Sequence, residues 1–92
     1  MRRAAKRDAN EGPIIDALLA VGAYVQQADF VDLVVGFRSR NYLLEIKQEN
    51  GRLTPRQEKL LAEWPGQYAI VRTPEEALRA VGAIGRGEEA GC

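Results

Sequence analysis

The chain has 92 residues, 28% of them charged, and its 13 basic and 13 acidic residues give a net charge of zero. This length predicts one small domain whose core is only marginally sufficient alone, so a homodimer is expected. A neutral chain has no global field that draws it onto nucleic acid, and any such binding requires local basic clusters. The absence of histidine excludes imidazole zinc sites and histidine general bases.

Cysteine content and hydropathy restrict the compartment. Cys92, the only cysteine, is the last residue, which excludes a disulfide or a cysteine zinc site within one chain. No apolar run reaches the length of a membrane span, and the N-terminus lacks the apolar core of a secretion signal. The sequence therefore predicts a soluble intracellular protein with no membrane partner, whose catalysis would use carboxylates, lysine, tyrosine or a metal.

Composition divides the chain into three parts. Residues 1–7 are rich in arginine and lysine without an apolar stripe, and they predict a flexible basic arm that is either solvated or in contact with phosphate. Residues 8–82 form the predicted domain. Residues 83–92 turn to glycine and glutamate, which predicts a disordered tail.

A first helix is expected to begin between Asp8 and Asn10, which are both good N-caps, and to end near Gly22. Glu11 precedes Ile14 by three residues and therefore lies on the apolar side of this helix. Its position alone favours a role at the helix N-terminus, either through the macrodipole or as the capping-box partner of Asp8.

After a short strand at residues 23–26, residues 32–47 (DLVVGFRSRNYLLEIK) predict a β-hairpin, because strand formers flank a polar turn. Side chains alternate between the two faces of a strand, so one face of this hairpin is apolar. The other face carries Asp32, Val34, Leu43, Glu45 and Lys47.

The register of the hairpin decides whether its acids meet. A pairing of Arg38 with Asn41 across a tight turn sets Asp32 opposite Lys47. Glu45 is then a diagonal neighbour of Asp32, at a Cα distance of roughly 7 to 8 Å. One cation could touch both carboxylates at that separation.

The polar face of the hairpin has the chemistry of phosphodiester hydrolysis. Asp32 and Glu45, with the backbone carbonyl of Ile46, offer hard oxygen ligands for Mg²⁺ or Mn²⁺. Lys47 lies beside them, where it would position the attacking water and stabilise negative charge on the phosphoryl oxygens. The alternative is a salt bridge between Lys47 and the two acids on a solvated sheet face.

Two further helices follow the hairpin. Thr54 and Gln57 open the first of them as Thr-Pro-x-Gln, so Gln57 is either the capping-box partner of Thr54 or a polar group that points at the acids. Residues 67–72 predict another strand, and the same threonine-proline start at Thr73 predicts a third helix.

In this order and spacing the motifs resemble the PD-(D/E)XK nuclease superfamily, and within it the small VRR-NUC type of phage and bacterial replication and repair proteins. The resemblance covers about residues 8–81. It departs from the motif at Val31, where a proline is usual. It rests on Asn10 and Glu11, on the segments VDLVVG and YLLEIK, on the Leu-Thr-Pro-x-Gln helix start, and on AIVRTPEEAL.

The resemblance implies an α/β fold, a small mixed β-sheet flanked by helices in the order αβββαβα. It implies that Asp32, Glu45 and Lys47 are the catalytic core. By the same likeness Glu11 is the first-helix acid that assists the metal directly or through water, and Gln57 is the polar residue contributed by the following helix.

The function implied is a Mg²⁺-dependent, structure-selective DNA endonuclease, with Mn²⁺ as a substitute, no nucleotide cofactor, and a cytoplasmic location in a bacterial or phage-infected cell. A dimer would grip two arms of branched, flap or junction DNA. The alternatives are a non-catalytic nucleic-acid or protein-binding module on this scaffold and a purely structural interaction protein. Basic side chains expected to contact phosphate are Arg38, Arg40, Arg52, Arg56 and Lys59.

Overall fold

The computed structural model describes residues 9–85. The predicted basic arm, residues 1–7, and most of the predicted tail, residues 83–92, lie outside this range. Ala83 is described, and its N–H donates to the Leu78 carbonyl at 2.8 Å while its side chain packs against the core. Packing against the core therefore continues past residue 82.

Residues 9–85 form three helices and four strands around one sheet. The strand order is β1-β2-β3-β4, in which only the β3–β4 pair is parallel. The prediction of a small α/β domain with a mixed sheet flanked by helices is confirmed. Along the chain the elements are α1 (Glu11–Ala20), β1 (Tyr24–Gln27), β2 (Leu33–Phe37), β3 (Arg40–Ile46), α2 (Pro55–Glu63), β4 (Tyr68–Val71) and α3 (Pro74–Ala80).

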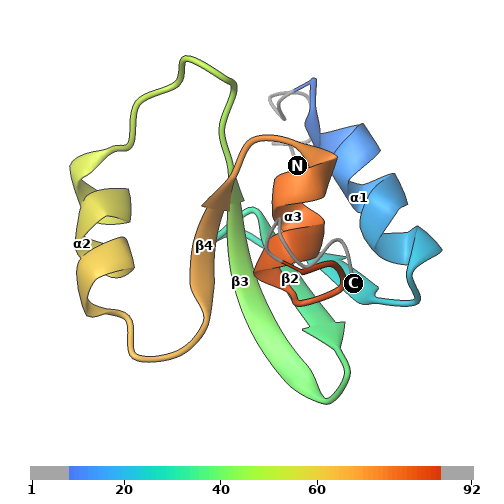
Figure 1. The fold of residues 1–92 in the computed structure, drawn as a ribbon. Helices are drawn as coiled ribbons and strands as arrows, with labels where there is room; N and C mark the ends of the chain where they lie inside the picture. The colour runs from blue at the N-terminus through green and yellow to red at the C-terminus, as the bar shows by residue number, and fades with distance from the viewer. Residues whose placement is uncertain (1–8, 86–92) are drawn as a thin grey trace.

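The helices divide between the two sides of the sheet. Figure 1 shows α1 and α3 packed together on one side, with α2 on the other side, next to β4. The apolar core lies under α1 and α3, because the alternating residues Leu33, Val35 and Leu44 turn toward Ile14 and Leu18 of α1. The intervening residues of the same strands point to the α2 side of the sheet, and they include the acids.

The helix starts follow the expected chemistry at two of the three helices. Thr54 Oγ1 accepts from the Gln57 N–H at 3.1 Å, and Gln57 Oε1 accepts from the Thr54 N–H at 3.0 Å, which completes a capping box at α2. Thr73 caps α3 through the Glu76 N–H at 3.0 Å. Asn10 is the N-cap of α1 but makes no side-chain cap bond. No helix within residues 9–85 has the length and apolar character needed to cross a bilayer.

The hairpin turn falls one residue earlier than predicted. Phe37 pairs with Arg40, so the loop consists of Arg38 and Ser39, whose φ angles are +53° and +68°. Positive φ at both central positions is the type I′ geometry whose twist matches a two-residue β-hairpin. The predicted pairing of Arg38 with Asn41 is wrong.

This turn moves the register by two residues. Val34 lies opposite Leu43, not opposite Glu45. An even shift leaves every side chain on its predicted face. One step beyond the last ladder pair, the observed register sets Asp32 directly opposite Glu45 in place of Lys47. Extended by that step, the observed register makes the two acids a direct cross-strand pair and not a diagonal one.

Candidate metal site on the α2 face of the sheet

Asp32 and Glu45 form an acid pair where the β2–β3 ladder ends. Asp32 is half-buried and Glu45 is 3% exposed. Asp32 Oδ2 accepts the hydrogen bond of the Ile46 N–H at 2.8 Å. At this point a side-chain oxygen takes the place of the backbone carbonyl that would continue the β2–β3 ladder. The carboxylate of Asp32 is thereby fixed against β3 beside Glu45.

Two side chains approach the same oxygen of Glu45. The Tyr68 hydroxyl donates to Glu45 Oε2 at 3.1 Å, and Arg56 Nη2 contacts the same oxygen at 3.5 Å. Burial raises the pKa of Glu45 above its ordinary value of 4.5, and the negative charge of Asp32 raises it further, whereas Tyr68 and Arg56 partly oppose the rise. Glu45 is thus a carboxyl group whose charge is only partly compensated.

Tyr68 is a site residue that the sequence did not indicate. It pairs with Leu43 across the parallel β3–β4 ladder, which puts its side chain on the same face as Glu45. Burial and the adjacent charge of Glu45 raise the pKa of Tyr68, so its hydroxyl remains a proton donor. Alternation within residues 67–72 predicts which residues share a face with Tyr68. The sequence does not indicate that this strand pairs with β3, and so it does not indicate that Tyr68 lies near Glu45.

Ile46 and Lys47 complete the end of β3. The Ile46 N–H points at Asp32, and since the N–H and C=O of a strand residue point to the same side, its carbonyl faces that side too. Lys47 is half-buried; its N–H donates to the Val71 carbonyl at 3.0 Å, and its carbonyl accepts from Asn10 Nδ2 at 3.1 Å. The ion pair recorded for Glu45 is with Arg56 and not with Lys47.

Glu11 occupies the first turn of α1 and is 4% exposed. Its Oε2 accepts from Gln27 Nε2 of β1 at 2.8 Å. Because Asn10 is the N-cap, Glu11 is not the third helical residue that a capping box with Asp8 requires, and Asp8 lies outside the described residues. Residues 9–85 contain no group of three acidic, histidine or cysteine side chains placed to hold a metal.

Gln57 is 8% exposed, and its Oε1 serves the capping box at the start of α2. This is one of the two interpretations that its position allowed. Arg56 lies in the same first turn of α2 and contacts Glu45. The capping box therefore stabilises the end of α2 that faces the acid pair.

Of the five basic side chains expected to contact phosphate, Arg56 is the one whose contacts lie at the acid pair. Arg38 lies in the hairpin turn and Arg40 directly follows it, at the end of β2 and β3 that is opposite to the acid pair. Lys59 forms an exposed ion pair with Glu63 at 3.9 Å, within α2. Arg52 is exposed in the connection from β3 to α2.

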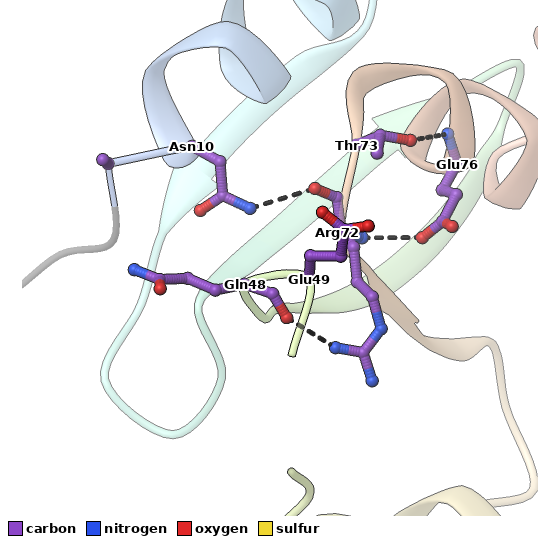
Figure 2. A pocket seen from close by; sticks show the side chains of 7 residues that line it. Asn10, Gln48, Glu49, Arg72, Thr73 and Glu76 are labelled. Atoms are coloured by element: carbon purple, nitrogen blue, oxygen red, sulfur yellow. Dashed lines mark hydrogen bonds between the residues drawn. The ribbon is translucent and has the colours of Figure 1, made fainter. Parts of the chain in front are cut away.

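An open pocket of about 540 Å³ adjoins the ends of β3 and β4. Asn10 Nδ2 donates to the carbonyls of Lys47 and Arg72 at 3.1 and 3.0 Å, as Figure 2 shows for Arg72. Since both contacts need a donor, the amide orientation is settled, and its buried Oδ1 has no partner among residues 9–85. Asn10 thus ties α1 to both strand ends. The pocket is lined by Ala9, Asn10, Gln48, Glu49, Arg72, Thr73 and Glu76.

No protein family, no curated protein and no solved structure matches this chain. The acid pair and the side chains around it therefore carry the functional inference. What they offer is two neighbouring carboxylates, a lysine two residues after Glu45, and an arginine at the start of α2.

Proposed function

We propose that the protein is a Mg²⁺-dependent nuclease that hydrolyses phosphodiester bonds in branched or flap DNA, with Mn²⁺ as a substitute. The observation that carries this proposal is the placement of Asp32 beside the buried Glu45, because Asp32 Oδ2 accepts from the N–H of Ile46, the residue that follows Glu45. Hard oxygen donors at such spacing suit Mg²⁺, which keeps several waters when it binds one or two carboxylates. The Ile46 carbonyl supplies a third oxygen on the same side.

Electrostatics support a cation at this position. Burial and then the neighbouring charge of Asp32 raise the pKa of Glu45, and a divalent ion would offset that repulsion between the acids. Tyr68 orients Glu45 through a hydrogen bond that a carboxylate accepts while it ligates a metal with its other lone pairs. Bound Mg²⁺ would polarise a phosphoryl oxygen and supply the attacking water.

The remaining roles fall to neighbouring residues. Lys47 holds the attacking water and offsets charge that grows on the phosphoryl oxygens. Glu11 assists through a water, and Gln57 keeps the start of α2 in place. Arg56, whose side chain is 57% exposed, exchanges its contact with Glu45 for a contact with the substrate phosphate when the metal arrives.

The element order supports membership of the PD-(D/E)XK superfamily and its VRR-NUC type, which the proposal includes. Helix, three strands, helix, strand and helix follow one another as the resemblance implies. A homodimer that acts in the cytoplasm on two arms of a junction belongs to the same proposal. Within residues 9–85 the chain consists of the sheet, its helices and their short connections, so selectivity for DNA structure is favoured over selectivity for sequence.

The proposal is tested by incubation with flap, splayed and four-way DNA in the presence of Mg²⁺ or Mn²⁺. Wild type should cut at least one of these substrates, and Glu45→Ala and Asp32→Asn should not. Glu75→Ala removes an exposed acid from α3 and should leave cleavage unchanged. Equal cutting by wild type and Glu45→Ala would assign the activity to another site or to a contaminant.

The contact between Arg56 and Glu45 favours an alternative function. A carboxylate already paired with arginine and tyrosine can be a structural element of a non-catalytic module that binds nucleic acid or protein. That module would show no metal-stimulated cleavage, and Asp32→Asn would bind DNA as wild type does. Metal-stimulated cleavage lost in Asp32→Asn excludes it.

A further inference from the structure

The loop between β1 and β2, residues 28–32, runs alongside the acid pair and is fastened at three points. The Ala28 N–H donates to the Asp32 carbonyl at 3.2 Å, and Asp32 Oδ2 accepts the Ile46 N–H. Arg56 Nη2 donates to the Phe30 carbonyl at 3.1 Å. The position of Phe30 is therefore set by the same contacts that set the site.

Phe30 presents its ring to water despite this fastening. It is 57% exposed, whereas its neighbour Val31 is 3% exposed. Single exposed apolar residues are common on proteins and need no explanation by themselves. Phe30 differs because one nitrogen of Arg56 contacts both its carbonyl and the carboxylate of Glu45, at 3.1 and 3.5 Å. The backbone of an exposed aromatic residue thus lies against an exposed guanidinium, which also contacts one carboxylate of the acid pair.

We propose that Phe30 is a stacking platform for an unpaired nucleobase next to the scissile phosphate. This inference rests on the proposed function and names its substrate class, a nucleic acid with a single-stranded segment at the point of cleavage. The cation at Arg56 takes the phosphate, and the ring face takes the adjacent base. A base inside a continuous duplex already stacks on its neighbours and cannot cover the ring without leaving the helix.

Stacking of a base on an aromatic side chain is sequence-tolerant, because every base has a π-face. Loss of one such contact weakens binding to single strands roughly tenfold. It leaves binding to a blunt duplex unchanged, since that binding depends on phosphate contacts. A loss of affinity for single strands without a loss of affinity for duplex therefore identifies a stacking platform.

The test compares Phe30→Ala, Phe30→Leu and Phe30→Trp with wild type, using the full chain. Tyr24→Ala is the matched control, because Tyr24 is 73% exposed and pairs with Gly36, about 13 Å along the strand from the level of Asp32. Fluorescence anisotropy measures binding of labelled oligothymidylate and of a blunt duplex without added metal. Cleavage of flap DNA and of continuous duplex with Mg²⁺ is measured in parallel.

Phe30→Ala and Phe30→Leu should lose roughly tenfold affinity for oligothymidylate and none for duplex, while Phe30→Trp and Tyr24→Ala should match wild type. Phe30→Leu keeps the apolar bulk without the ring, so it separates stacking from a merely structural contribution of the loop. Equal losses on both nucleic acids, or no loss on either, would overturn the platform.

Failure of the platform is distinguishable from failure of the proposed function. Wild type that cuts DNA with Mg²⁺, combined with Phe30 variants that do not discriminate single strand from duplex, removes the platform and leaves the nuclease. Wild type that never cuts, combined with the expected loss of oligothymidylate binding, removes the nuclease and supports the platform as part of a binding module.

Discussion

Leu44 and Glu45 are consecutive residues of β3 that are buried almost equally, on opposite faces of the sheet. Leu44 lies in the apolar core beneath α1 and α3, where burial stabilises the fold by about 25 cal/mol for each Å² of apolar surface. Glu45 lies on the α2 face, where burial of a carboxylate is unfavourable unless partners compensate it. One strand thus contributes an apolar core residue on one side and a buried carboxyl group with a raised pKa on the other.

The helices that cover the two faces differ in the same way. α1 buries Ile14 and Leu18 in the core, whereas the only buried residue of α2 is Gln57. The start of α2 is held by its capping box and by the contacts of Arg56. Polar contacts therefore hold the start of α2 against the acid pair.

The largest effect is expected from the apolar face. Leu44→Ala should lower the free energy of unfolding by about 2 to 5 kcal/mol, because the side chain is fully buried and leaves a cavity. Leu43→Ala, on the half-buried polar face, should cost clearly less. Denaturant titration of both variants measures the difference, and equal losses would mean that the two faces contribute alike to stability.

The pH dependence of the unfolding free energy should report on Glu45, the buried acid of the polar face. The pKa of Glu45 is raised in the folded state above its ordinary 4.5, so the folded protein binds more protons than the unfolded chain in the window just above that value. Its contribution to stability is fully present below pH 4.5 and is lost as pH rises through the folded pKa.

Glu45→Gln keeps the shape of the side chain and removes its titration. The variant should therefore gain stability relative to wild type as the pH is raised from 4.5 to neutrality. Urea titrations at a series of pH values measure this difference. A difference that stays constant with pH would show that the unfavourable charge on Glu45 is fully compensated in the folded state.

A smaller effect is expected at the start of α2. Thr54→Ala removes the hydroxyl that accepts from the Gln57 N–H and should cost about 1 kcal/mol in unfolding free energy. Thr54→Ser retains the acceptor and should restore most of that loss, which thermal unfolding can measure. A loss from Thr54→Ser as large as that from Thr54→Ala would indicate that the methyl group matters and the cap does not.

Local chemistry made much of the fold predictable. The threonine-proline starts of α2 and α3 depend on residues three positions apart, and they formed as expected. The shared face of Leu43 and Glu45 depends only on alternation along one strand. Such features need no knowledge of which segments meet in space.

The rest depended on contacts that the sequence does not specify. The register followed from positive φ at Arg38 and Ser39, which are residue types that seldom adopt this conformation outside turns. Tyr68 and Arg56 reach Glu45 only because β4 pairs parallel to β3 and α2 covers that face. The residue pattern within one segment predicts neither the contact of Tyr68 with Glu45 nor the contact of Arg56 with Glu45.

The central claim is that Asp32 and Glu45 bind a divalent cation, and a titration of Mn²⁺ followed by electron paramagnetic resonance tests it most directly. At neutral pH, wild type and Glu75→Gln should remove free Mn²⁺ from solution, and Asp32→Asn should not. Binding by Asp32→Asn equal to that of wild type, or no binding by wild type, would contradict the claim.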